Sequence, residues 1–146
     1  QDKITNLQGF STDLINKTLT RTNLIDADII EVSLLLTNDG HIAELNRKYR
    51  NIAKATNVLS FPNYNFITAN PYKKEFINIG DVVIAYETML REASEQAKKL
   101  TDHFAHLFVH SILHLLGFDH IETKQQKIME EIEIAILADL GIENPY

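Results

Sequence analysis

The stretch DHFAHLFVHSILHLLGFDH, residues 102–120, predicts an apolar helix that ends in a tight turn. The helix is expected over 102–116, and either Thr101 or Asp102 offers the short polar side chain that favours a helix start. Gly117 follows, and glycine readily takes the left-handed conformation that ends a helix. The chain is therefore expected to fold back on itself at this glycine.

Three histidines stand in the second half of this stretch, out of six in the whole chain. A helix places His110 and His114 on one face, with Cβ atoms about 5–6 Å apart, and the turn would bring His120 to the same point. Three imidazole nitrogens at about 2.0–2.1 Å from one zinc ion, with water in the fourth position, describe a catalytic site. We therefore predict that these histidines bind one Zn²⁺. The alternative is a set of core histidines with satisfied hydrogen bonds, which is the expectation for His103 and His106.

The rest of the chain predicts a single α/β domain. Helices are expected at 6–22, from 38 or 39 to 50, at 87–99 and at 124–140, and strands at 29–37, 57–61 and 79–85. The polar, aromatic stretch between Pro62 and Asn78 has no clear period. It is too long for a simple connector and is expected to be functional.

Composition narrows the class of protein. The 146 residues suffice for one domain, and the lack of cysteine excludes disulfides and thiolate metal sites. That suits a reducing compartment, so the cytoplasm is expected. No apolar run approaches the roughly 18 residues of a membrane span, and the start of the chain lacks the features of a signal peptide. No membrane partner is expected.

Charge is distributed unevenly. The net charge of −6 argues against a polyanionic partner, yet residues 45–74 contain six basic side chains and no acidic one. The basic residues are Arg47, Lys48, Arg50, Lys54, Lys73 and Lys74, and the aromatic residues among them are Tyr49, Phe61, Tyr64, Phe66 and Tyr72. Cations beside rings on which bases stack are typical of single-stranded nucleic-acid binding. The alternative is a solvated basic face with aromatic side chains in the core.

The metal motif also restricts the chemistry. HSILHLLGFDH has the histidine and glycine spacing of the metzincin proteases, but Ser111 stands where a protease needs a glutamate base. Phosphodiester hydrolysis fits better, because zinc lowers the pKa of its bound water to about 7 and polarises a phosphoryl oxygen. A guanidinium from the basic segment would stabilise charge on the phosphate.

Several separated motifs resemble those of the YbeY-type metal-dependent endoribonucleases. They are HSILHLLGFDH; Leu45, Asn46, Tyr49 and Arg50; TNVLSFP from Thr56 to Pro62; Gly80 to Ile84; Met129; and the ending from Gly141 to Tyr146. The motifs occur in the family's order over nearly the whole chain. One departure is Ser111, where the family usually has glycine, and this larger side chain is expected to narrow access to the site.

The resemblance implies a fold and an activity. It implies one α/β (α+β) domain over residues 1–146, with a small mixed four-stranded sheet and about five helices. The metal site would lie on a helix in the C-terminal half and on the following loop. Family members usually have a strand before the first helix, which would lie before Gln1. The implied activity is cutting of single-stranded RNA in ribosomal RNA maturation at the 3′ end of the small-subunit RNA, and in ribosome quality control. The small ribosomal subunit is the implied partner, and no DNA is expected.

Roles for single residues come from the resemblance and from the residues themselves. The resemblance implies a zinc ion on His110, His114 and His120 and places Arg50 in the substrate cleft, where we expect it to contact the scissile phosphate as the catalytic arginine. The expected RNA-binding residues are Arg47, Lys48, Arg50, Lys54, Ser60, Lys73 and Lys74. Asp81 and Asp119 would either orient a ligand imidazole or shape the chain locally. Two alternatives remain, namely a metalloprotease that uses a remote acid as base and a ribosome-associated RNA-binding protein with structural zinc.

Overall fold

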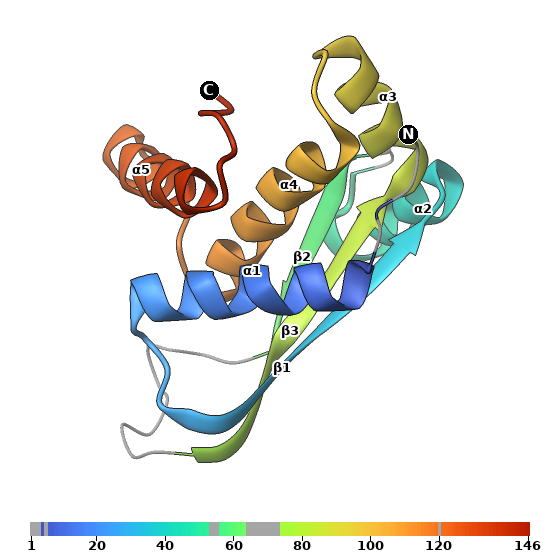
Figure 1. Ribbon diagram of the computed structural model, residues 1–146. Coiled ribbons are helices and arrows are strands. Elements are labelled where there is room, and N and C mark those ends of the chain that lie inside the picture. The colour runs from blue at the N-terminus through green and yellow to red at the C-terminus, as the bar shows by residue number, and fades with distance from the viewer. Residues whose placement is uncertain (1–3, 5, 53–55, 64–73, 120) are drawn as a thin grey trace.

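A three-layer arrangement of helices and sheet is seen in the computed structural model of the chain, which describes residues 4, 6–52, 56–63, 74–119 and 121–146 (Figure 1). The elements in these residues are α1 (Leu7–Thr22), β1 (Ala27–Thr37), α2 (Asp39–Arg50), β2 (Val58–Pro62), β3 (Lys74–Ala85), α3 (Tyr86–Glu95), α4 (Leu100–Leu115) and α5 (Thr123–Asp139). This confirms the predicted α+β class and the five helices.

The sheet is mixed, with strand order β1-β3-β2. β3 lies in the centre, parallel to β1 and antiparallel to β2. The described residues form three strands, so the expected count of four is not met within them. The sequence itself contains only three β-branched apolar runs, and the fourth strand was expected from the family resemblance alone.

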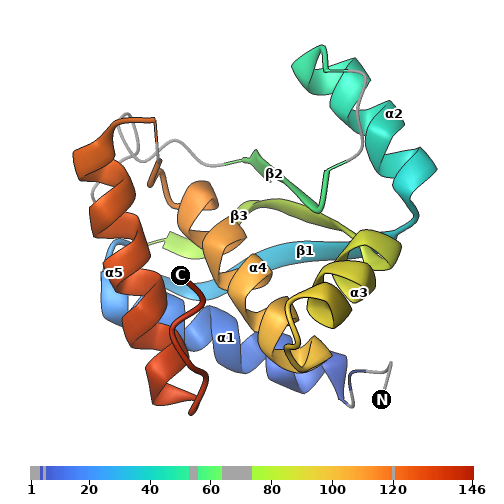
Figure 2. The same cartoon turned by 90° about the horizontal axis from the view of Figure 1, so that it is seen from above.

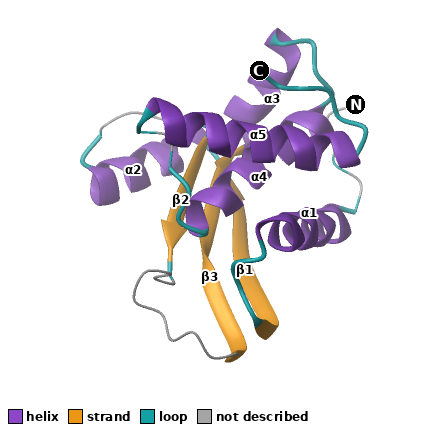
Figure 3. Ribbon diagram, turned by 90° about the vertical axis from the view of Figure 1, so that its left-hand side faces the viewer, coloured by secondary structure: helices purple, strands orange, loops and turns teal. Residues whose placement is uncertain are grey.

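Both faces of the central strand are covered, which explains its continuous apolar run. Val82 and Ile84 belong to the main core with α1, α4 and α5, whereas Val83 and Ala85 pack with Ile42 of α2. Figures 2 and 3 show α2 across the sheet from α1. A strand that is buried on both faces holds the elements on its two sides in fixed positions.

Helix α4 is the central element of the main core. It runs between the sheet and α5, and eleven of its sixteen residues are buried (Figure 2). It begins at Leu100, and neither Thr101 nor Asp102 caps it, because burial of Leu100 brings the first turn into the core. Gly117 has φ +98°, as predicted for the turn that follows. In the described part of the chain, no helix combines the length and apolar character that a membrane crossing requires.

Two other element boundaries differ by four or five residues from the sequence prediction. β3 begins at Lys74 instead of 79, because its first half pairs with β1, as in the partners Ile29 and Phe76. α3 ends at Glu95 instead of 99, because Ala97 takes a left-handed φ of 53°. The amide of Lys98 then donates to the carbonyl of Ala93, which completes a helix-ending turn.

Candidate metal centre

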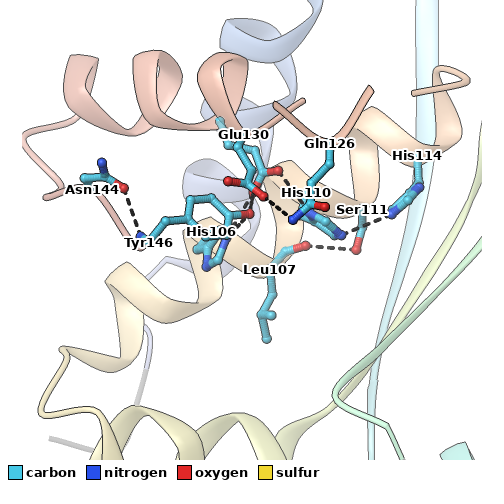
Figure 4. A network of polar contacts seen from close by, with 10 residues as sticks. His106, Leu107, His110, Ser111, His114, Gln126, Glu130, Asn144 and Tyr146 are labelled. Carbon is cyan, nitrogen blue, oxygen red and sulfur yellow. Dashed lines mark hydrogen bonds and ion pairs between the residues drawn. The ribbon is translucent and has the colours of Figure 1, made fainter. Parts of the chain in front are cut away.

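Two of the three predicted ligands lie together on α4. His110 and His114 are half-buried, and their ring centroids are 4.6 Å apart with an interplanar angle of 81° (Figure 4). The helical spacing of four residues explains why they face one another. His120 lies outside the described residues, so its place as third ligand stays a prediction.

Each of these two imidazoles has its Nδ1 atom bonded to an oxygen. Nδ1 of His114 lies 3.0 Å from the carbonyl oxygen of Phe118, in the turn that Gly117 permits. Nδ1 of His110 lies 3.0 Å from Oε2 of Glu133 on α5. A carbonyl and an ionised carboxylate only accept hydrogen bonds, so both Nδ1 atoms must donate. A neutral imidazole with a proton on Nδ1 has its lone pair on Nε2.

The two Nε2 atoms are only 3.0 Å apart. Two lone pairs at this distance repel unless a cation, either a metal ion or an additional proton, lies between them. Two nitrogens on a tetrahedral zinc at about 2.0–2.1 Å are about 3.3 Å apart, close to the separation found here. The donor set therefore fits zinc. The described residues, which leave out 120, contain no group of three or more side chains that could hold a metal ion.

A cleft of about 730 Å³ opens beside these histidines. It is lined by Asn46, Arg50, Ile52, Thr56, Asn57, Val58, Leu59, Ser60, Pro62, His110, His114, Gly117, Phe118, Asp119 and Ile121. The TNVLSFP motif of β2 and the end of α2 thus form one wall, and α4 with its turn forms the other. Two parts of the chain that are far apart in the sequence, residues 46–62 and residues 110–121, meet in this cleft.

Arg50 lies in the cleft but also has a structural contact. Its Nη2 donates to the backbone carbonyl of Ser60 at 3.0 Å, which ties the end of α2 to β2. This bond uses one of the five N–H groups of the guanidinium. Ser60 is buried and lines the same cleft. Both predicted residues are therefore at the cleft that contains the histidines.

The structure describes only some of the remaining residues that were predicted to bind RNA. Arg47 and Lys48 are exposed on α2, and Nζ of Lys48 lies 5.2 Å from the ring centroid of the exposed Tyr49. That ring packs edge-on against Phe61, with centroids 5.4 Å apart. Lys54, Lys73, Tyr64, Phe66 and Tyr72 lie outside the described residues, and of Lys74 only the backbone is described.

The carboxylates named from the sequence have different positions. Asp81 is exposed on β3 and alternates with Val82, which faces α4, so Asp81 points away from the histidines. Asp119 lines the cleft. Ser111 does not narrow the cleft, contrary to expectation, because its side chain is fully buried and Oγ donates to the carbonyl of Leu107 at 2.8 Å (Figure 4).

Sequence reasoning missed the contacts that two carboxylates make, one of them fully buried and the other partly buried. Glu133 bonds to His110, and Glu92 bonds both to His103 Nε2 at 2.9 Å and to the Asn57 side chain at 3.2 Å. Burial, the largest effect, lowers the pKa of His103, and the Glu92 bond opposes it. The expectation that His103 is a core residue with a hydrogen bond is confirmed. Glu133 had one signal in the sequence, since it falls on the apolar face of its helix, four residues after Met129.

Comparison with known proteins agrees with this geometry. A sequence model of the family described as Endoribonuclease YbeY matches residues 1–141. A protein of Methylocella silvestris named Endoribonuclease YbeY is 44% identical over 133 residues, which are 91% of this chain and 72% of that relative. A protein of Rhizobium johnstonii with the same name is 47% identical over 116 residues, 80% of this chain and 66% of the relative.

A likeness of fold extends to a solved structure. A solution structure of a Thermotoga maritima protein has a TM-score of 0.59 and 22% sequence identity to this chain. The match covers 94% of this chain and 85% of the other. At this identity the comparison concerns the fold alone, and it supports the single-domain α+β architecture.

Proposed function

Because this chain belongs to the Endoribonuclease YbeY family, we propose that it is a zinc-dependent endoribonuclease that cuts single-stranded RNA during ribosomal RNA maturation. The proposal rests chiefly on the 3.0 Å approach of the Nε2 atoms of His110 and His114 at the cleft. With His120 as third ligand, one zinc ion would have three histidine ligands. When bound there, zinc would supply Lewis acidity toward a phosphoryl oxygen and lower the pKa of a water molecule.

The residues of the cleft account for the other parts of the reaction. Arg50 would donate parallel hydrogen bonds to phosphate oxygens while its bond to Ser60 keeps the guanidinium in place. The carbonyl of Phe118 and the carboxylate of Glu133 would keep the two ligand imidazoles in the tautomer that leaves Nε2 toward the metal. The exposed Tyr49 ring beside Lys48 would offer a base-stacking surface next to Arg50.

The biological setting follows from the family and stays part of the proposal. We propose that the substrate is the 3′ region of small-subunit ribosomal RNA, that the small ribosomal subunit is the partner, and that the enzyme also acts in ribosome quality control. Such work would take place in the cytoplasm. The remaining basic residues, Lys54, Lys73 and Lys74, would add electrostatic attraction for the RNA backbone.

Metal removal tests the proposed reaction directly. The wild-type protein is expected to cut a labelled single-stranded RNA, to lose this activity with a chelator and to regain it with added zinc. A duplex of the same sequence and a single-stranded DNA should stay intact. Casein cleavage instead of RNA cleavage would favour the metalloprotease. RNA binding without cleavage in excess zinc, together with unfolding after metal removal, would favour a structural zinc.

The contribution of Arg50 can be separated from its contact with Ser60. Arg50→Lys keeps the charge but loses the planar fork, so kcat/KM for RNA should fall about 10–100-fold, the equivalent of one or two charge-assisted hydrogen bonds. The melting temperature should change by only a few degrees, because a single partly buried hydrogen bond is lost. Arg21→Lys is the matched control, because Arg21 is exposed on α1 and does not line the cleft. Equal activities of the two variants would contradict the assigned role.

A further inference from the structure

Glu133 is an ionisable side chain that is completely buried between α4, α5 and the segment after α5. Its Oε1 accepts from the Tyr146 hydroxyl at 2.7 Å and from Nε2 of His106 at 3.0 Å. Its Oε2 accepts from Nδ1 of His110 at 3.0 Å. A buried carboxylate is costly unless it is paired and hydrogen-bonded, and this one has donors on both oxygens.

These contacts determine which nitrogen of His110 carries a proton. The Glu133 carboxylate accepts the Tyr146 hydroxyl and His106 Nε2 on Oε1, and His110 Nδ1 lies 3.0 Å from Oε2. A carboxylate that accepts on both oxygens leaves Nδ1 of His110 as the donor of this bond. The Nε2 atom of His110 is then left as the ligand atom that faces His114.

The segment after α5 completes this arrangement. Figure 2 shows it running back along α5 toward α4. The backbone amide of Tyr146 donates to Oδ1 of Asn144 at 2.9 Å, which shapes the segment, and the Tyr146 ring packs edge-on against His106 at 5.2 Å (Figure 4). The hydroxyl of Tyr146 lies 3.1 Å from Nε2 of His106, so the tyrosine contacts both the carboxylate and its second donor. Burial raises the pKa of Tyr146 and the bond to Glu133 raises it further, so the hydroxyl remains a donor.

We propose that Glu133 is a positioning residue that fixes the tautomer and orientation of His110, and that Tyr146 holds Glu133 in the required geometry. The segment Asn144–Tyr146 would thereby set the affinity of a metal site whose ligands are on another helix. Carboxylate partners of ligand imidazoles typically change metal affinity by about 10–100-fold. The inference rests on the proposed function only where it concerns zinc.

The test combines a tautomer measurement with a binding measurement. Imidazole nitrogen chemical shifts of metal-free protein at pH 8 should show His110 protonated on Nδ1 in the wild type. In Glu133→Gln these shifts should move toward a mixture of tautomers, and the Kd for zinc, measured by competition with a chelating dye, should rise about 10–100-fold. Tyr146→Phe removes only the hydroxyl at a side chain that is 56% exposed, so it should fold and raise the Kd about fivefold. Glu131→Gln, at an exposed position of α5, is the matched control and should behave as the wild type.

The outcomes distinguish two roles of Glu133. It either positions His110, or it forms a purely structural tie that only links α4 and α5. A structural tie would lower the melting temperature of Glu133→Gln and leave the His110 tautomer unchanged, which overturns the proposal. Wild-type zinc affinity in both variants overturns it as well. If the wild type bound no zinc, the proposed function would fail, and the tautomer in metal-free protein would still decide the role of Glu133. If Glu133→Gln did not fold, the nitrogen shifts and zinc affinity of Tyr146→Phe would decide.

Discussion

Replacement of His114 by alanine is expected to lower zinc-dependent cleavage of single-stranded RNA about 1000-fold. The metal is expected to supply several kcal/mol of transition-state stabilisation, and each 1.36 kcal/mol corresponds to a factor of ten in rate. His114 is half-buried at the cleft, and its Nε2 lies 3.0 Å from that of His110. Without it, a bound metal ion would lose one of its proposed ligands, and Nε2 of His110 would no longer have the Nε2 of His114 opposite it.

This measurement needs controls for contamination and for folding. Wild type, His114→Ala and His41→Ala should be purified in parallel, because trace ribonucleases imitate weak activity. His41 is exposed on α2, its Nδ1 contacts Oγ1 of Thr37, and it does not line the cleft. Bound zinc and circular dichroism are measured for each. Equal cleavage by all three proteins, or the same zinc content in His114→Ala as in the wild type, would contradict the assignment of His114 as a ligand.

Most of the predicted helices and strands are confirmed, because they depend on patterns among residues that are close in the sequence. The apolar spacing before Thr22 marked α1, and the side chain of Asn38 caps α2 as one of the two predicted candidates. The glycine after α4 adopts the left-handed conformation that the turn requires. Each of these features depends on residues within a few positions of one another, which a sequence displays directly.

Features that depend on long-range pairing were not predictable in the same way. The first half of β3 is a strand because β1 lies beside it, although its own residues showed no clear period. The partner of His110 is Glu133, 23 residues later, and only a folded chain brings α5 against α4. Of the two roles left open for Asp81, its exposed position on β3 favours the local structural one, because a strand alternates the direction of its side chains.

The cleft also contains features that the sequence predicted and features that it did not. The spacing of His110 and His114 predicted that their side chains face one another, and the two rings do so in the structure. Their role as metal ligands stays a prediction. The bond from Arg50 to the backbone of Ser60 had no signal in either motif, because a backbone carbonyl acts as acceptor whatever the side chain. A sequence therefore indicates which side chains carry the chemistry more readily than which groups hold them in place.

Gly80→Ala is expected to lower the free energy of unfolding by about 2–6 kcal/mol. Gly80 has φ +142°, a conformation that residues with a Cβ rarely adopt, and such strain costs about 1–3 kcal/mol. An added Cβ would overlap the backbone carbonyl oxygen of Phe61 and lie 2.8 Å from Cδ2 of Leu115. The end of the Leu115 side chain can shift, but the Phe61 carbonyl belongs to the backbone of β2, and overpacking of this kind costs about 1–3 kcal/mol more.

The matched control is the same substitution in α2. A Cβ added at Gly40 would lie 3.4 Å from its nearest neighbour, Oδ1 of Asn38, which is an ordinary contact distance. Gly40 also lies in a helix, where alanine is favoured over glycine. Thermal unfolding should show a melting temperature lowered by about 5–20 °C for Gly80→Ala and unchanged or slightly raised for Gly40→Ala. Similar melting temperatures would show that the sheet accommodates a side chain at Gly80. The glycine matters for the site because it permits the close approach of β3 to β2, the strand whose backbone receives the bond from Arg50.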